Sequence, residues 1–232
     1  MFPATTQLIA FPLSQACLIQ GAIIGWTVFI GVVLAAIFLG PPLWFNEVQT
    51  GYLYTGAFIG SILGLVLSGL LSDSISRTMV KLNKGRYEPE FRILLVLFQL
   101  VFCGVGLYGF GIVAEDVGRY GWLVVDVFFA FVVIGMVMGA VASALYIVDA
   151  HRKWTVSRRA GTSLLTIAGN IAIESFTCML IFKNLFSFVL TFFAYDWLVS
   201  NGIRPAFLAI SSIQMGICVL SIPMCTCVPC SD

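Results

Sequence analysis

Residues 17–39 read CLIQGAIIGWTVFIGVVLAAIFL and contain no charged side chain. An α-helix rises about 1.5 Å per residue, so about 20 apolar residues cross the roughly 30 Å hydrocarbon core of a bilayer. A soluble helix of this length would need a polar face. Five further stretches are also long and apolar, and two of them contain a single charged residue, Asp126 and Lys183. We therefore predict an all-α membrane protein with six transmembrane helices. The predicted spans cover about residues 17–39, 51–71, 93–114, 122–148, 175–195 and 205–224.

The composition of the chain excludes a soluble domain. Hydrophobic residues make up 60% of the sequence and charged residues only 10%, whereas about a quarter of a soluble domain is charged. We expect a lipid bilayer around the chain and no nucleic acid partner. His151 is the single histidine, and the sequence contains no G-x-S-x-G or nucleotide-binding loop, so we expect no enzyme activity, cofactor or metal site.

The basic residues indicate the orientation of the chain. Ten of them lie in or beside the loops that follow the second and fourth spans, and only Arg119 and Arg204 lie on the opposite side. Cytoplasmic loops carry an excess of Lys and Arg, so we expect both basic loops and both termini in the cytoplasm, with the plasma membrane as the location. The ten are Arg77, Lys81, Lys84, Arg86, Arg92, Arg152, Lys153, Arg158, Arg159 and Lys183.

Two terminal segments flank the predicted bundle. Residues 1–16 form a cytoplasmic N-terminal segment without the basic start of a signal peptide. Residues 225–232 form a cytoplasmic tail with three cysteines, at Cys225, Cys227 and Cys230. Metal binding, juxtamembrane palmitoylation and no role at all are the three alternatives for this tail.

The loop pattern also indicates an internal repeat. In the first three spans the long basic loop follows the second span, and in the last three it follows the first. This asymmetry suits two three-helix units of opposite topology, the 3+3 inverted repeat of many transporters.

A motif at the end of the second span supports a transporter. Residues 69–77 read GLLSDSISR and resemble the G-x-L-x-D-x-x-x-R motif of the major facilitator superfamily, which lies in a cytoplasmic loop between helices. The resemblance implies that Gly69, Asp73 and Arg77 form a cytoplasmic gating cluster. We expect Gly69 to let two helices approach closely, and Asp73 to accept a hydrogen bond from Arg77 or to face a helix N-terminus.

Further segments resemble a fungal group of this superfamily that is related to drug–proton antiporters. Residues 84–92 read KGRYEPEFR and carry the loop residues Glu88, Glu90 and Arg92. Residues 146–149, 182–188 and 222–224 also match this group in order and spacing. The resemblance implies that the six spans are helices seven to twelve, the C-terminal half-bundle of a twelve-helix carrier. It further implies transport of small organic molecules by alternating access, with proton coupling.

The same resemblance places the substrate cavity against the first, second, fourth and fifth spans. Polar or aromatic residues there are the candidate substrate contacts, because a polar residue in a span usually faces the bundle or a wet cavity. For Gln20 the alternative is a hydrogen bond to another helix, and for Trp26 it is packing. The candidates are Gln20, Trp26, Tyr146, Asn184 and Ser187.

Asp126 is the one carboxylate inside an apolar span. Buried acids in transporters can carry protons, which makes Asp126 the candidate for proton coupling. It lies four residues past Trp122, only about 6 Å along the helix. A shallow position near the outer headgroups is the alternative.

Three departures from the family pattern leave the whole protein open. The N-terminal six helices are missing, residues 153–170 form an atypical cytoplasmic insertion, and the cysteine-rich tail replaces the expected ending. We therefore weigh a transporter half against a transport-incompetent fragment or a membrane partner or structural protein. The expected partner is the missing N-terminal half or, alternatively, a second copy of this chain.

The orientation can be tested by cysteine labelling in intact cells. We predict that a cysteine replacing Lys84 is not labelled by an impermeant thiol reagent, because the basic loop is cytoplasmic. A cysteine replacing Asn46 is expected to be labelled. The reverse pattern would contradict the predicted orientation.

Overall fold

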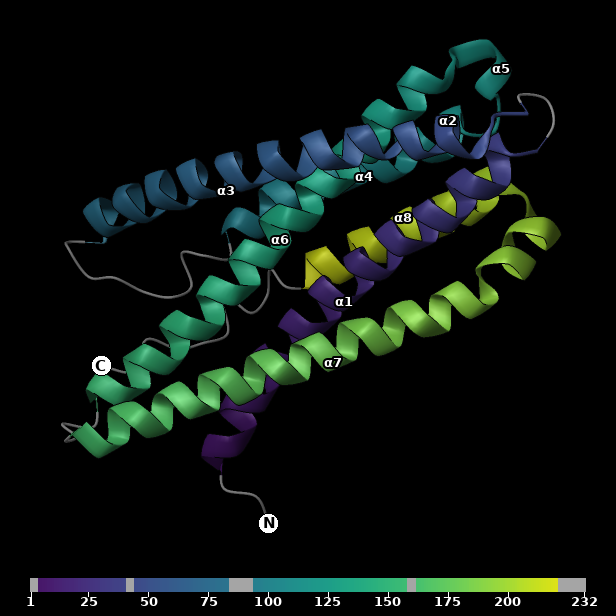
Figure 1. Ribbon diagram of the computed structural model, residues 1–232. Coiled ribbons are helices and arrows are strands. Elements are labelled where there is room, and N and C mark those ends of the chain that lie inside the picture. Colours follow the sequence, from purple (N-terminus) through teal and green to yellow (C-terminus); the bar gives the residue numbers. More distant parts are fainter. Residues whose placement is uncertain (1–3, 41–43, 84–93, 158–161, 221–232) are drawn as a thin grey trace.

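The computed structural model describes residues 4–40, 44–83, 94–157 and 162–220, and the regular secondary structure within these ranges is entirely helical. Figure 1 shows the helices as a bundle, with α2, α5 and the α7–α8 turn gathered at one end. The helices are α1 (Ala4–Phe38), α2 (Glu47–Tyr52), α3 (Tyr54–Leu82), α4 (Leu94–Val113), α5 (Val117–Tyr120), α6 (Trp122–Ser157), α7 (Thr162–Asn201) and α8 (Ile203–Leu220).

Six helical segments are long and apolar enough to cross a membrane, which confirms the predicted all-α fold with six spans. The second of them joins α2 and α3, and the other five each lie within one helix. The segments are Leu18–Phe38, Glu47–Leu82, Leu94–Val113, Trp122–Leu145, Phe176–Phe193 and Ile203–Leu220.

Three helices are much longer than the roughly 20 residues that cross a bilayer. The helices α1, α6 and α7 contain 35, 36 and 40 residues, and α7 is therefore about 60 Å long. The described parts of residues 153–170, expected as an insertion, belong to the end of α6 and the start of α7. Charged residues such as Arg152 and Lys153 are not expected within a span, but the backbone hydrogen bonds of α6 continue past them.

The backbones of α3 and α6 approach each other closely. Gly56, Gly60 and Gly64 lie four residues apart on one buried face of α3. A Cβ atom at Gly60 would lie 2.7 Å from the carbonyl oxygen of Ala130, and one at Gly64 would lie 3.2 Å from the Cα atom of Ile134. Because the contacts advance in the same direction on both helices, α3 and α6 run parallel.

The helices α1 and α7 form a second parallel pair. A Cβ atom at Gly21 would lie 2.7 Å from the ring of Phe182, and one at Gly25 would lie 2.7 Å from the ring of Phe186. The first span of each three-span unit thus packs on the second span of the other unit. Two three-helix units of opposite topology produce this crosswise pairing.

The helices α4 and α8 cover one side of α6 and α1. Gly106 of α4 meets Val132 of α6, whereas Cys103 meets Gly135, so these two helices are antiparallel. The rings of Phe110 on α4 and Phe207 on α8 lie 4.8 Å apart, and both side chains are fully buried. Figure 1 shows α3 and α7 on opposite sides of this arrangement.

Gly69 does not make the expected close approach within the described part of the chain. A Cβ atom there would meet no atom within 4 Å, and the residue is exposed. The small residues that face α6 recur every four positions and end with Ser68 and Ser72. Gly69 is one residue past Ser68, which turns it about 100° away from that face.

A pair of substitutions on α3 tests this packing. We predict that Gly60→Leu destabilises the bundle by at least about 1–3 kcal/mol, because the new side chain overlaps the backbone of α6. Gly69→Leu is the matched control on the same helix and should leave the thermal unfolding midpoint in detergent nearly unchanged. Equal effects of both substitutions would contradict the α3–α6 contact.

Candidate functional site

Trp26 is buried inside the bundle, where it joins three helices. Its side chain is 4% exposed, and its Nε1 donates a hydrogen bond to Oε1 of Gln214 on α8 at 3.1 Å. Its ring packs edge-on against Phe186 of α7, with ring centroids 5.8 Å apart. Trp26 therefore ties α1 to α7 and α8 and occupies a packed position in this conformation.

Gln214 is a polar residue of the bundle that the sequence analysis did not single out. It is 1% exposed, and its Nε2 donates to Sγ of Cys218 at 3.4 Å. A glutamine within a span usually faces the bundle interior, where it can form hydrogen bonds. The position of Gln214 in the apolar segment Ile203–Leu220 could therefore have identified it as a buried polar residue from the sequence.

Gln20 and Ser187 carry polar atoms that are buried without a partner. Gln20 is 2% exposed, and its Oε1 forms no hydrogen bond within the described residues. The same holds for Oγ of Ser187 on α7. Gly21, the neighbour of Gln20, packs against the ring of Phe182 on α7. Gln20 on α1 and Ser187 on α7 therefore belong to the same pair of packed helices. Each is a hydrogen-bonding group without a protein partner in the described part of the chain.

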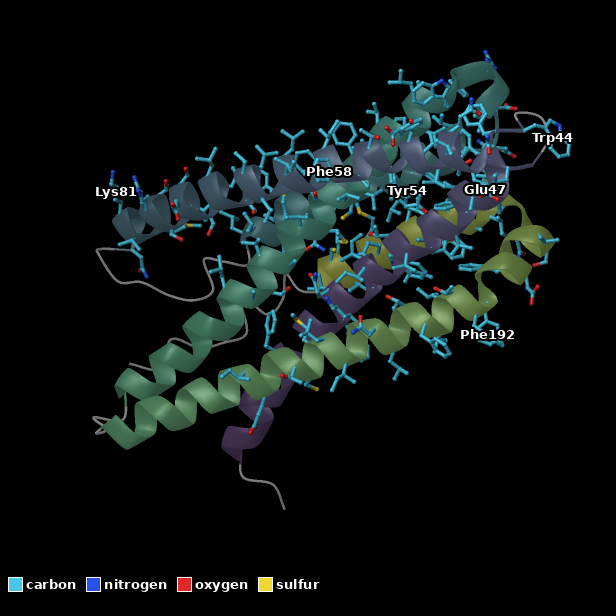
Figure 2. All side chains as sticks on the ribbon, in the orientation of Figure 1. Trp44, Glu47, Tyr54, Phe58, Lys81 and Phe192 are labelled. Carbon is cyan, nitrogen blue, oxygen red and sulfur yellow. The ribbon has the colours of Figure 1, made fainter. Side chains whose placement is uncertain are left out.

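Asn184 lies on the free face of α7. It is exposed, as are Leu185, Phe188 and Phe192, the last of which projects away from the bundle in Figure 2 and is 73% exposed. The apolar segment of α7 is the least buried of the six spans, followed by that of α3. Asn184 is therefore a polar group on a surface that the bundle itself leaves uncovered. The side chain of Tyr146, the fifth candidate, lies outside the described residues.

Asp73 and Arg77 lie on the last turns of α3, toward the end marked by Lys81 in Figure 2. Both side chains are exposed, and no ion pair joins them among the described residues. Glu47 and Tyr54 mark the opposite end of the same segment in Figure 2, so the gating candidates lie far from that end. The loop candidates Glu88, Glu90 and Arg92 lie outside the described residues.

Asp126 faces α3 rather than the α1–α7 pair. It is half-buried one turn into α6, and its Oδ1 packs against the backbone of Gly56. The backbone of Gly56 hydrogen-bonds to the carboxyl group of Asp126, whose buried Oδ1 has no further partner among the described residues. The structure thus separates Asp126 from Gln20, Trp26 and Ser187.

Metal ligands do not gather within the described residues. No group of three or more His, Cys, Asp and Glu side chains there could hold a metal ion. The cysteines Cys225, Cys227 and Cys230 lie outside the described residues.

These features define a multi-pass helical membrane protein with a six-span bundle. Protein HOL1 of Saccharomyces cerevisiae is 23% identical over 79% of this chain and 28% of its own length. MFS-type transporter atr4 of Stereocaulon alpinum is 33% identical over 50% of this chain and 20% of its own length. MFS transporter cpaT of Aspergillus oryzae is 26% identical over 52% of this chain and 24% of its own length.

Other fungal relatives bear similar names, and one, from Floropilus chiversii, is named an efflux pump. No family model matches the chain, and no solved structure matches it significantly. The chain matches only between a fifth and three tenths of the length of the three relatives described above. The six-span fold and the names of these relatives support membership of the major facilitator superfamily (MFS).

The Trp26–Gln214 hydrogen bond gives a test of the α1–α8 contact. We predict that Trp26→Phe destabilises the protein by about 1–3 kcal/mol, because Oε1 of Gln214 is then buried without its donor. Combining it with Gln214→Met should cost less than the sum of the two single changes, measured by thermal unfolding in detergent. Trp122→Phe, at an exposed site, is the control, and strict additivity at Trp26 and Gln214 would contradict the contact.

Proposed function

We propose that this chain is the C-terminal six-helix half of a twelve-helix carrier that transports small organic molecules by alternating access. The observation that carries the proposal is the crosswise parallel pairing of α1 with α7 and of α3 with α6, in a chain whose relatives are named transporters. Such paired three-helix units form the rigid bundles that rock against one another in transporters.

The free faces of α3 and α7 support a second bundle as the partner. These are the two least buried spans, and alternating access requires a second bundle to rock against. The N-terminal six-helix half is the proposed partner, and a second copy of this chain is the alternative. A transport-incompetent fragment or a membrane partner or structural protein is the second candidate function, because the described residues form one bundle.

Within this proposal, the α1–α7 pair contributes the substrate contacts. Gln20 and Ser187 offer hydrogen-bonding atoms without a protein partner, and Asn184 offers an exposed amide. Trp26 acts behind them by fixing α1 on α8, and Tyr146 remains a candidate from the sequence. Asp73 and Arg77 are the proposed gating pair, which is expected to contact the partner bundle.

Location and coupling are proposed on the sequence pattern. The basic loops favour a cytoplasmic location for both termini, and the plasma membrane is the proposed membrane. Proton coupling is implied by the family resemblance, and Asp126 is the candidate acid because it is a carboxylate within a span.

Reconstitution in vesicles tests the proposal. We predict that the chain alone inserts into the bilayer, because its helices satisfy their own backbones, but does not concentrate small organic dyes. Co-expression with the first six helices of a relative should restore uptake, and Asp73→Asn should then slow it while leaving dye affinity within a few-fold.

Concentrative uptake by the chain alone would contradict the half-bundle proposal and favour a homodimeric carrier. As a control, the supplied partner bundle should carry dyes when it is joined to its own second half. If this chain inserts beside that partner bundle and no uptake occurs, the fragment or partner-protein function is favoured.

A further inference from the structure

Lys183 is the only charged residue of the apolar segment Phe176–Phe193 on α7. It belongs to a row with Met179, Phe186 and Leu190, spaced by four, three and four residues along the helix. Met179 is 3% exposed, and Phe186 and Leu190 pack against the buried core. The structure thus places a half-buried cation on the face of α7 that packs on the bundle.

Lys183 lies close to the middle of the hydrocarbon core. Phe186, one turn further along α7, packs against Trp26, which donates its hydrogen bond to Gln214. Each of these three residues lies near the middle of the apolar segment of its own helix. Three helical residues advance about 4.5 Å, so about 10 Å of hydrocarbon separates Lys183 from the nearer membrane surface. This distance exceeds the length of a lysine side chain, so the ammonium group does not reach the lipid phosphates.

No carboxylate in the described part of the chain neutralises Lys183. Glu115 pairs with Arg204 at 3.7 Å, and Asp126 packs against α3 near the start of α6. Glu174 is exposed and lies nine residues before Lys183, which is about 13 Å along the helix. Lys183 forms no ion pair or hydrogen bond with any described residue. An uncompensated cation within a span is costly, and such residues mark binding sites for substrates or ions.

Two unpartnered polar groups lie beside this cation. Ser187 follows Lys183 by one turn on the same face, and its buried Oγ has no partner. On α1, a Cβ atom at Gly21 would lie 3.7 Å from the Cα atom of Lys183, and the adjacent Gln20 carries the unpartnered Oε1. An ammonium and a hydroxyl are both hydrogen-bond donors, and a carboxylate is the acceptor that forms the stronger, charge-assisted bond.

Aromatic rings cover the same part of the helix pair. The rings of Phe182 and Phe186 stack with centroids 6.3 Å apart, and Trp26 packs edge-on against Phe186. Sites for small molecules are mostly apolar, with a few polar groups that fix the orientation of the ligand. One cation, two polar groups and three rings therefore match an organic anion with an apolar or aromatic body.

We propose that Lys183 is an anion-binding residue of the α1–α7 pair, and that the substrate is a small monocarboxylate with an apolar or aromatic body. The ammonium group of Lys183 binds the carboxylate, and the hydroxyl of Ser187 donates a hydrogen bond to it. The aromatic rings contact the body of the ligand. This inference rests on the proposed function, which assigns the substrate contacts to the α1–α7 pair, and it adds the chemical class of the substrate.

Ligand-induced shifts of the thermal unfolding midpoint test the site in the full chain in detergent. The probe is phenylacetate, and phenylacetamide and phenethylammonium are its neutral and cationic counterparts with the same ring. We expect phenylacetate to raise the midpoint and to bind at least about tenfold more tightly than either counterpart, because only the carboxylate pairs with the ammonium group.

Substitutions at Lys183 locate the binding. Lys183→Gln should weaken phenylacetate binding at least about tenfold. The midpoint of the ligand-free variant should be equal or higher, because an unpaired charge leaves the bundle, so unfolding does not explain the lost binding. Lys183→Arg keeps the charge and should bind within a few-fold of the unchanged chain. Lys81→Gln, at an exposed site on the far end of α3, is the matched control and should bind normally.

Three results would overturn the proposal: no phenylacetate binding to the unchanged chain, equal binding of the three probes, or equal binding by the Lys183→Gln and Lys81→Gln variants. Binding that disappears on co-expression with the first six helices of a relative would also overturn it, because Lys183 then pairs with a carboxylate of the partner bundle. None of these measurements uses uptake. Concentrative uptake by the chain alone would contradict the half-bundle proposal without changing the outcome for Lys183.

Discussion

The glycine-lined contact between α3 and α6 is the interaction on which the rest of the bundle depends. Lipid tails are as apolar as the helices, so helices in a bilayer associate through close packing rather than through hydrophobic burial. Gly60 and Gly64 bring α3 against the backbone of α6, while Gly135 on another face of α6 receives Cys103 of α4. Helix α6 therefore carries a span on each of two faces, and α1 with α7 completes the second parallel pair.

The number of spans and the all-α class could be predicted from the sequence because bilayer thickness fixes how long an apolar stretch must be. The helix ends could not, since charged residues such as Arg152 and Lys153 were expected beyond the end of a span, yet α6 continues past them to Ser157. The contact face of α3 was recognisable in principle, as Gly56, Gly60 and Gly64 recur every four residues. The family motif drew attention to Gly69 instead, which faces away from α6.

The sequence selected the candidate site residues by their type, but it did not give their orientation. A polar residue in a span is expected to face the bundle interior or a water-filled cavity. The packing of the surrounding helices determines which helix that residue contacts. Trp26 forms a hydrogen bond with Gln214, which lies 188 positions away in the sequence. No local sequence pattern indicates this pairing. Gln20 and Ser187 remain buried without partners among the described residues, whereas Asn184 lies on the free face of α7. The α1–α7 pair thus contains both residues that pack the bundle and residues that are proposed to contact the substrate.

Cysteine cross-linking between α3 and α6 tests the crosswise parallel pairing most directly. Leu71 and Val141 pack against the same buried cluster, whereas Leu123 lies at the other end of α6. In a background without native cysteines, the account predicts that Leu71→Cys cross-links to Val141→Cys through a short reagent in membranes and does not cross-link to Leu123→Cys. Cross-linking of position 71 to position 123 but not to position 141 would mean that α3 and α6 run antiparallel, and it would contradict the account.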